Sequence, residues 1–429
     1  MLARTRREML AALAGASTDL AGWPRGSAFL DEMQRRAFLF FWENSSPATG
    51  LVLDRALAAG GERRTVASSA ATGFGLAAFC VASERGWMDR GLLRQRILAA
   101  LRHYAQNALH EHGWFYHFTD VESGARVWNS EVSSIDTALL LAGIITARQY
   151  WADVEITSLA DAIYDRIDFR WMLNGHPALL SHGWKPETGF LANRWDSFCE
   201  LQILYILGMA SRTTSLPDAS WQAWKRPWMQ YGGYRYVSGA DPLFVHQYSH
   251  AWLDFRGRRE LGGEEIDWFQ NSRIATRAHR AFCIELGKTR FPGCYSSDLW
   301  GITASDSRKG YVAWGGPPPH PALDGSVVPC AAGGSLMFEP DLCLRALETM
   351  HARFGQRIWQ RYGFVDAFHP VDGWTNPDVI GIDLGITLLS AENARSGAVW
   401  RWFMSFEPVR QAMDRVLTPE AKRRSGRNI

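Results

Sequence analysis

The chain has 429 residues, 47% of them hydrophobic, and its 46 basic and 44 acidic side chains leave a formal net charge of +2. That much apolar sequence is enough for one large core and excludes a disordered chain. The basic residues are scattered apart from the terminal "AKRRSGR", and no apolar run reaches the length of a membrane span. Neither nucleic acid nor a bilayer-spanning segment is therefore expected.

Residues 1–22 contain the pair Arg6-Arg7 and then a short apolar run, a pattern typical of a twin-arginine export signal. Gly15 interrupts that run, so a flexible N-terminus or an amphipathic first helix is the alternative. A working signal would make the protein periplasmic or secreted rather than cytoplasmic. No shift in composition divides residues 23–418, which we expect to form one domain before a basic tail at 419–429.

Helical periodicity dominates the sequence. It predicts helices at residues 27–45, 68–86, 91–109, 132–151, 155–169, 196–210, 218–230, 246–254, 264–287, 338–354, 383–403 and 406–417. Twelve helices in one uninterrupted chain favour an all-α fold, an (α/α)6 toroid of six helical hairpins. Long connections rich in glycine and aromatic residues, at 111–128, 293–329 and 364–379, are then expected to carry a site at one end.

The stretch "SEVSSIDTALLLAG" places Glu131 and Asp136 at the start of the helix expected at 132–151. Ser133 or Ser134 is a good N-cap, and Asp136 falls within the first turn. Free backbone N–H groups and the positive end of the helix dipole favour an ionised carboxylate there. Asp136 is therefore predicted to act as a base, and simple support of the helix start is the alternative.

The counterpart is Glu200 in "CELQILYILGMAS", where apolar residues surround the carboxylate. Loss of hydration favours the neutral form and raises the pKa, which suits a proton donor. A buried ion pair with an arginine such as Arg194 is the alternative. An acid and a base kept apart by their surroundings are what the hydrolysis of a glycosidic bond requires.

Twenty tryptophans, many of them in the connections, offer flat faces for sugar rings. The expected substrate-binding residues are His117, Trp128, Trp195, His246, Tyr248, Asp254, Arg256, Trp300, Asp306, Trp314, Asp383 and Glu392. His246 and His250 have the i, i+4 spacing of zinc ligands, but the Glu of HExxH and a third ligand are missing. The six cysteines lack metal-type spacing and are expected to be buried free thiols, so no metal or cofactor is predicted.

Segments from about residue 30 to 415 resemble, in order, those of the glucoamylase-like domain of bacterial glycoside hydrolases, which is related to endo-β-1,2-glucanases. They include "ASSAATGFGLAAF", "GWFYHFTD", "LFVHQYSHAWLDFRG", "WGITASD" and "YGFVDAF". The resemblance implies an (α/α)6 toroid that hydrolyses β-linked glucans, β-1,2-glucan above all, usually with inversion and without a metal. It also implies that Glu200 is an essential glutamate and that Asp136 matches a carboxylate at the start of another helix.

Two departures concern the linkage. The relatives carry further acidic residues where this chain has Asn129 to Ser133, and many have Gln where Leu384 follows Asp383. We therefore expect a glycoside hydrolase for a β-glucan or a related oligosaccharide, with Glu200 as acid and Asp136 or Glu131 holding the water. An exo-acting α-glucosidase of glucoamylase type and a non-catalytic carbohydrate-binding toroid are the alternatives.

Overall fold

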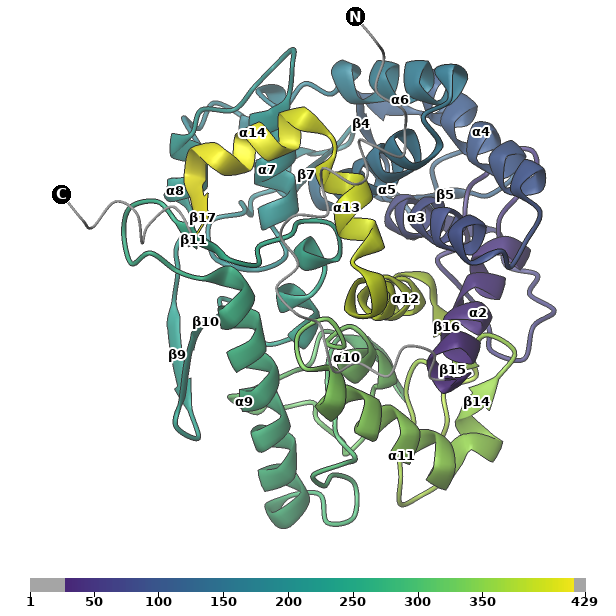
Figure 1. Ribbon diagram of the computed structural model, residues 1–429, viewed down its shortest axis with the longest axis vertical. Helices are drawn as coiled ribbons and strands as arrows, with labels where there is room; N and C mark the ends of the chain where they lie inside the picture. The colour runs from purple at the N-terminus through teal and green to yellow at the C-terminus, as the bar shows by residue number, and fades with distance from the viewer. Residues whose placement is uncertain (1–27, 420–429) are drawn as a thin grey trace, which may run out of the picture.

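The computed structural model describes residues 28–419, so the predicted export signal and the basic tail beyond residue 419 lie outside the described residues. The helices are arranged around a ring (Figure 1). The outer helices are α2 (Ala28–Glu43), α4 (Arg90–Gln106), α6 (Val154–Arg166), α8 (Ala219–Ala223), α9 (Trp268–Thr289) and α11 (Pro340–Ile358). The inner elements are α3 (Ser69–Arg85), α5 (Ser134–Trp151), α7 (Gln202–Ala210), the 3-10 turns η2 (Leu243–His246) and η3 (Ser249–Ala251), α10 (Pro329–Gly333) and α12 (Gly381–Ser396).

Burial separates the inner from the outer elements. All nine residues of α7 and 14 of the 17 residues of α3 are buried, whereas α6 buries 4 of 13 and α11 buries 5 of 19. An outer helix needs only one apolar face, because its other face meets solvent. The described chain thus alternates between an outer and an inner element six times, which is the (α/α)6 toroid that the sequence predicts.

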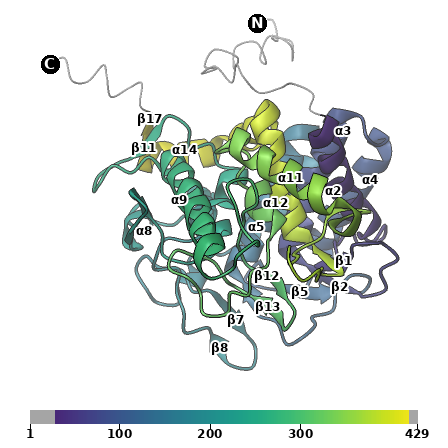
Figure 2. The same ribbon diagram turned by 90° about the horizontal axis from the view of Figure 1, so that it is seen from below.

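Short strands lie at one end of the ring and lead into the inner helices. β2 (Val66–Ser68), β6 (Val132–Ser133) and β16 (Asp378–Ile380) precede α3, α5 and α12 directly. Their antiparallel partners are β5 (Phe118–Asp120), β7 (Gly183–Lys185) with β8 (Gly189–Phe190), and β1 (Arg55–Leu57). Figure 2 shows β1, β2, β5, β7 and β8 at the end opposite α14 (Glu407–Val416), together with the hairpin of β12 (Ser305–Ser307) and β13 (Gly310–Val312). The N-termini of three inner helices therefore open at this end, where helix dipoles are positive.

Two predicted helices differ from the structure in the middle of the chain. The helix predicted at 196–210 begins only at Gln202. The one predicted at 218–230 is helical only in α8, and its last three residues begin a hairpin of β9 (Trp228–Tyr231) and β10 (Tyr234–Val237). Gly232 and Gly233 form its turn with positive φ, and tyrosines on both sides favour strands. The sequence therefore carried a hairpin signal that helical periodicity concealed.

Two further predicted helices are interrupted. The stretch 246–254 forms 3-10 turns instead of an α-helix, and the stretch 383–403 is divided into α12 and α13 (Ala398–Met404) at Gly397, whose φ is 63°. The remaining elements are η1 (Trp171–Leu173), β3 (His110–Glu111), β4 (Trp114–Phe115), β11 (Arg258–Glu260), β14 (Trp359–Gln360), β15 (Gly363–Phe364) and β17 (Leu417–Pro419).

The cysteines and the helix lengths agree with the sequence. All six cysteines are free thiols, and five of them are buried. Among residues 28–419, no helix combines the length and the apolar character that crossing a membrane requires.

Glycine allows the inner helices α3 and α5 to approach closely. A Cβ atom at Gly143 would lie 2.0 Å from the carbonyl oxygen of Gly73, and a Cβ at Gly73 would lie 2.3 Å from the carbonyl oxygen of Leu139. Backbone atoms cannot yield as the end of a flexible side chain can. The close spacing of α3 and α5 therefore requires glycine at both positions.

We predict that Gly143→Ala lowers the free energy of unfolding by about 2–3 kcal/mol, the upper part of the usual cost of overpacking, because the new atom meets backbone. Chemical denaturation followed by circular dichroism measures the change. The control is Gly355→Ala in α11, where the nearest atom to the new Cβ is 3.5 Å away. Alanine there should stabilise the helix by about 0.5–1 kcal/mol. A Gly143→Ala protein as stable as the wild type would contradict the close approach of α3 and α5.

Candidate active site

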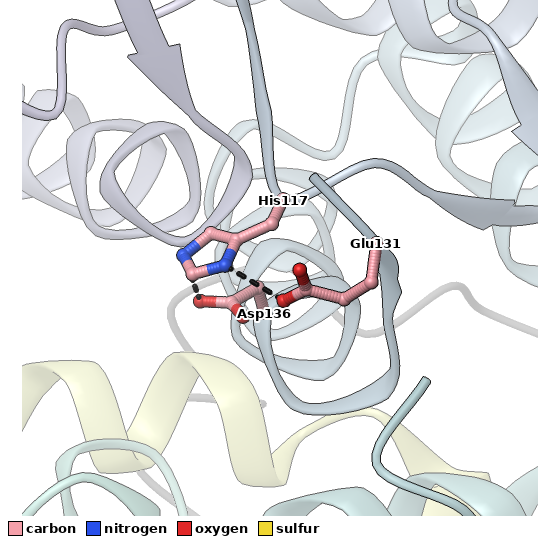
Figure 3. Close-up of side chains that lie close together, drawn as sticks. All are labelled: His117, Glu131 and Asp136. Carbon is pink, nitrogen blue, oxygen red and sulfur yellow. Dashed lines mark hydrogen bonds and ion pairs between the residues drawn. The ribbon is translucent and has the colours of Figure 1, made fainter. Parts of the chain in front are cut away.

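Three predicted side chains meet at the N-terminus of α5 (Figure 3). The ring of His117 lies between two carboxylates, with Nδ1 3.0 Å from Glu131 Oε1 and Nε2 3.4 Å from Asp136 Oδ1. Ser133 is the N-cap of α5, and its hydroxyl accepts from the backbone N–H of Asp136 and donates to Asp136 Oδ2 at 2.5 Å. The cap predicted from the sequence thus fixes Asp136 in the first turn.

The cluster is an ion pair shared by one imidazole and two carboxylates. Burial opposes the charge of His117, but the charges of Asp136 and Glu131 outweigh burial and raise the pKa of His117. The hydrogen bond from His117 lowers the pKa of Glu131 to about 2, against the opposing effect of burial. At neutral pH Glu131 is therefore firmly ionised and serves as a poor proton acceptor.

The same three residues have the ligand types of a metal site, with ligand atoms within 4.8 Å of one another. A metal-binding histidine must be neutral, because the metal takes the lone pair that a proton would occupy. Both ring nitrogens of His117 face a carboxylate, and its raised pKa favours the protonated form. As the structure describes it, the cluster is an imidazolium bridge between two carboxylates.

Glu200 precedes α7 and lies within electrostatic reach of this cluster. Ser249 donates its hydroxyl to the backbone carbonyl of Glu200 at 2.7 Å, which fixes the chain before α7. Burial raises the pKa of the Glu200 carboxyl to about 7, and the negative charge of Asp136 adds to the rise. A carboxyl with this pKa retains a proton for donation at neutral pH.

A second polar group of the site lies at the N-terminus of α12. Asp383 occupies the first turn of that helix, and the hydroxyl of Tyr248 donates to its Oδ1 at 3.5 Å. Burial raises the pKa of the Tyr248 hydroxyl well above its usual value, and the charges of Asp383 and Glu200 act in the same direction. The Tyr248 hydroxyl therefore interacts electrostatically with both Asp383 and Glu200, and it connects the α7 and α12 sides of the site.

Asp366 is buried behind Asp383 and shares a proton with it. Its Oδ2 accepts from the backbone N–H of Asp306 at 2.8 Å and from the side-chain amide of Asn376 at 3.2 Å. Burial, together with the charge of Asp383, raises the pKa of Asp366 well above its usual value. Burial also raises the pKa of Asp383, to about 6, although a hydrogen bond from Asp366 opposes the rise. The pair holds a proton near neutral pH, and Asp366 is its main carrier.

Many of the predicted site residues lie at this end of the toroid: His117, Glu131, Asp136, Glu200, Tyr248, Asp306 and Asp383. Trp128 projects from the connection between β5 and β6 and is exposed. Trp195 is buried below His182 and donates its indole N–H to Ser134 Oγ at 2.7 Å, so its role is to support the start of α5.

Three predicted sugar-binding residues are buried in the core, which contradicts their assignment. Trp300, Trp314 and His246 are at most 3% exposed. The ring of His246 faces Ser238 Oγ at 3.2 Å, and burial lowers its pKa to about 3. His250 behaves in the same way beside Ser272. The large rings fill the core because a toroid of this size needs bulky side chains, and the two histidines are neutral structural groups.

Asp254, Arg256 and Glu392 are not brought together with Glu200, because they lie toward the opposite end of the toroid. Glu392 is nine residues after Asp383, or roughly 13 Å further along α12 at the rise of an α-helix. It pairs at 2.9 Å with Arg85 in the last turn of α3. Asp254 pairs with Arg256 at 2.7 Å, and Arg256 stacks on Trp400 of α13. Sequence spacing alone does not tell which end of a helix a carboxylate reaches.

Sequence reasoning missed Asp366, Asn376 and Arg55. Arg55 binds Asp306 at 2.7 Å and Asp54 at 2.9 Å. Asp366 stands in the apolar run "GFVDAF". A carboxylate among apolar neighbours is the same kind of signal that identified Glu200. The other two carry no local signal, since Asp306, which both of them bind, is 251 residues from Arg55 and 70 residues from Asn376 in the chain.

Comparison with known proteins places this fold and site within one family. The profile of the family described as "Glycoamylase: Putative glucoamylase" matches residues 192–407. An exo β-1,2-glucooligosaccharide sophorohydrolase of Parabacteroides distasonis is 27% identical, with 90% of this chain and 57% of that protein covered. The chain thus spans a little more than half the length of that curated relative.

Solved structures show the same architecture. An endo-β-1,2-glucanase from Chitinophaga pinensis, in complex with sophorotriose and glucose, superimposes with a TM-score of 0.84 at 26% identity. The match covers 91% of this chain and 98% of that one. An endo-β-1,2-glucanase from Talaromyces funiculosus, at 12% identity and with 91% and 88% of the two chains covered, shares the fold with a TM-score of 0.67. The protein is an (α/α)6 toroid, and the chain belongs to the glycoamylase family.

The pKa shifts of Glu131 and His117 predict a pH window for the ion pair. The pKa of Glu131 is lowered from 4.5 to about 2, so its contribution to stability is present above pH 4.5 and is lost as the pH falls toward 2. The pKa of His117 is raised above 6.5, so its contribution is present below pH 6.5 and is lost as the pH rises through the folded pKa. The pair is therefore strongest between these limits.

We predict that Glu131→Gln lowers the free energy of unfolding by about 1–2 kcal/mol near pH 5.5, after allowance for solvent screening of a partly exposed pair, and by less at pH 3 and pH 9. Urea denaturation at the three pH values measures this. Glu187→Gln, which removes a surface partner of Arg126, is the control and should show no such maximum. If Glu131→Gln lowered the free energy of unfolding by the same amount at all three pH values, this would contradict an imidazolium shared by Glu131 and Asp136.

Proposed function

We propose that the protein is a glycoside hydrolase that cleaves β-1,2-linked glucan or gluco-oligosaccharides, with Glu200 as the general acid. The proposal rests on the contrast between Glu200, whose pKa is raised to about 7, and Asp136, whose negative charge reaches it at the same end of the toroid. The similarity to an endo-β-1,2-glucanase and to a sophorohydrolase supports the choice of substrate.

The reaction consumes one water molecule. Glu200 gives its proton to the glycosidic oxygen as the bond from this oxygen to C1 breaks. Water attacks C1 from the opposite face and gives one proton to a carboxylate base, so the product sugar has the inverted configuration. The base then returns its proton to solvent and Glu200 takes one up, which restores the starting state.

Asp136 is the base that we favour. Glu131 is the weaker choice, because its bond to His117 holds its pKa at about 2 and leaves it little affinity for a proton. Asp383 is the rival, since it begins another inner helix and its pKa is raised to about 6. Both carboxylates sit at helix N-termini that open at the same end.

We predict that Glu200→Gln, which keeps the shape of the side chain and removes its acidic proton, lowers kcat by about 10²–10⁴-fold. Release of reducing ends from β-1,2-glucan measures turnover, and calorimetric titration with a β-1,2-linked trisaccharide should show binding preserved. In the wild type, kcat/KM should fall above about pH 7, because deprotonated Glu200 cannot donate. Near-normal turnover in the variant would reject the assignment of the acid.

We also predict that Asp136→Asn lowers kcat by about 10²-fold or more, whereas Asp383→Asn acts more weakly. Proton NMR of the first product reports the anomer and should show inversion. If Asp383→Asn abolished turnover while Asp136→Asn retained it, the role of the base would pass to Asp383 and the reaction class would stand. Retention of configuration at C1 would reject the direct attack of water on the substrate.

The panel of substrates should include an α-1,4-glucan, because the family description names glucoamylase. Release of glucose from the α-glucan alone would replace the β-glucan proposal with the exo-acting α-glucosidase. Binding of glucans without any released reducing ends would favour the non-catalytic toroid.

A further inference from the structure

Two aromatic side chains are unusually exposed among the described residues, and both lie at the end that carries Glu200. Trp128 is 67% exposed and Tyr311 is 53% exposed, and the other strongly exposed large hydrophobic residues of residues 28–419 are leucines and valines. Burial and the charges of Asp383 and Asp366 raise the pKa of the Tyr311 hydroxyl, so this hydroxyl reaches into the acidic site. Trp128 instead presents its indole to solvent.

The backbone at Trp128 holds an unfavourable conformation. Trp128 has a φ of 57° and the next residue, Asn129, has a φ of 48°. Asparagine tolerates this left-handed region, but a bulky aromatic residue rarely adopts it. Such a conformation persists only where the surrounding structure enforces it, and it occurs often at ligand-binding sites.

The surrounding loop provides that enforcement. Arg126 donates to the backbone carbonyl of Ser130 at 2.6 Å, which bridges the two ends of the strained segment. Ser130 in turn exchanges hydrogen bonds with the backbone of Phe118 at 3.0 and 3.3 Å. Arg126 is itself held by Glu187 and by the ring of Tyr116. The exposed indole is therefore held in place before any ligand arrives.

A chain of ring contacts links Trp128 to the proposed base. Trp128 and Phe118 pack edge-to-face, with ring centroids 5.1 Å apart, and Phe118 stacks on His117 with centroids 3.7 Å apart. His117 contacts Asp136 directly. The rings of Phe118 and His117 thus separate the indole from Asp136, so Trp128 is continuous with the site but remote from the sugar that is being cleaved.

We propose that Trp128 is a stacking platform for a glucosyl unit remote from the scissile bond, and that it makes the enzyme prefer longer chains. This inference rests on the proposed hydrolysis of a β-glucan. The C–H face of a glucose ring is apolar and matches an indole face, while its hydroxyl groups remain in water. A rigid, exposed indole loses little conformational freedom on binding, so its contact translates efficiently into affinity.

The decisive variant is Trp128→Gly, because glycine adopts a positive φ without strain. A side chain that merely stabilised the loop would lower Tm when removed, whereas a functional one held under strain leaves Tm unchanged or raised. On long β-1,2-gluco-oligosaccharides we expect KM to rise about tenfold with kcat unchanged, which corresponds to about 1.4 kcal/mol of contact. On the shortest cleaved substrate we expect no change.

Two companion variants define the effect. Trp128→Phe keeps a flat ring and should restore most of the affinity for long chains. Val154→Ala, at an 87% exposed position where α6 begins, is the control and should behave as the wild type. Equal KM values for wild type and Trp128→Gly at every chain length would overturn the inference alone. A fall in Tm with equal losses on all lengths would also overturn it, and absence of cleavage by the wild type would reject the proposed function with it.

Discussion

The site depends on the common direction of the inner helices. Gly73 packs against Leu139 and Gly143 in α5, and Gly385 of α12 packs against Phe74 one residue further along α3. Arg85 at the end of α3 pairs with Glu392 near the end of α12. Tyr150 near the end of α5 likewise donates its hydroxyl to Ser83 near the end of α3. These pairings show that α3, α5 and α12 run in the same direction. Their N-termini therefore lie together, and each contributes the positive end of its dipole to the same end.

Within that shared field, local surroundings give each carboxyl group a different protonation state. An imidazolium holds Glu131 ionised, while burial keeps a proton on Glu200 near neutral pH. Asp366 and Asp383 share a proton because two carboxylates cannot both ionise cheaply in a buried site. A single end of one fold thus supplies both proton donors and proton acceptors.

Sequence predicts best what is decided locally. The helical patterns of α3, α5 and α9, the Ser133 cap with Asp136, and the apolar surroundings of Glu200 are properties of stretches of at most 22 neighbouring residues. The network of Arg55, Asp306 and Asn376 was not predictable, because Arg55 and Asp306 are 251 residues apart in the chain. The assignment of Trp300 and Trp314 to sugar binding failed for a related reason. An indole serves a core and a sugar-binding surface equally well, and only tertiary burial decides between them.

The balance of charge at this end supports the proposal of a neutral sugar chain as substrate. Arg55 faces both Asp54 and Asp306, and His117 faces both Glu131 and Asp136, so each cation is shared by two carboxylates. The remaining negative charge repels anionic ligands and costs a neutral glucan nothing. Cleavage of a glycosidic bond passes through a transition state with oxocarbenium character, which carries positive charge at the sugar ring. A preorganised surplus of carboxylates stabilises that charge more than it stabilises the neutral substrate, which is the condition for catalysis.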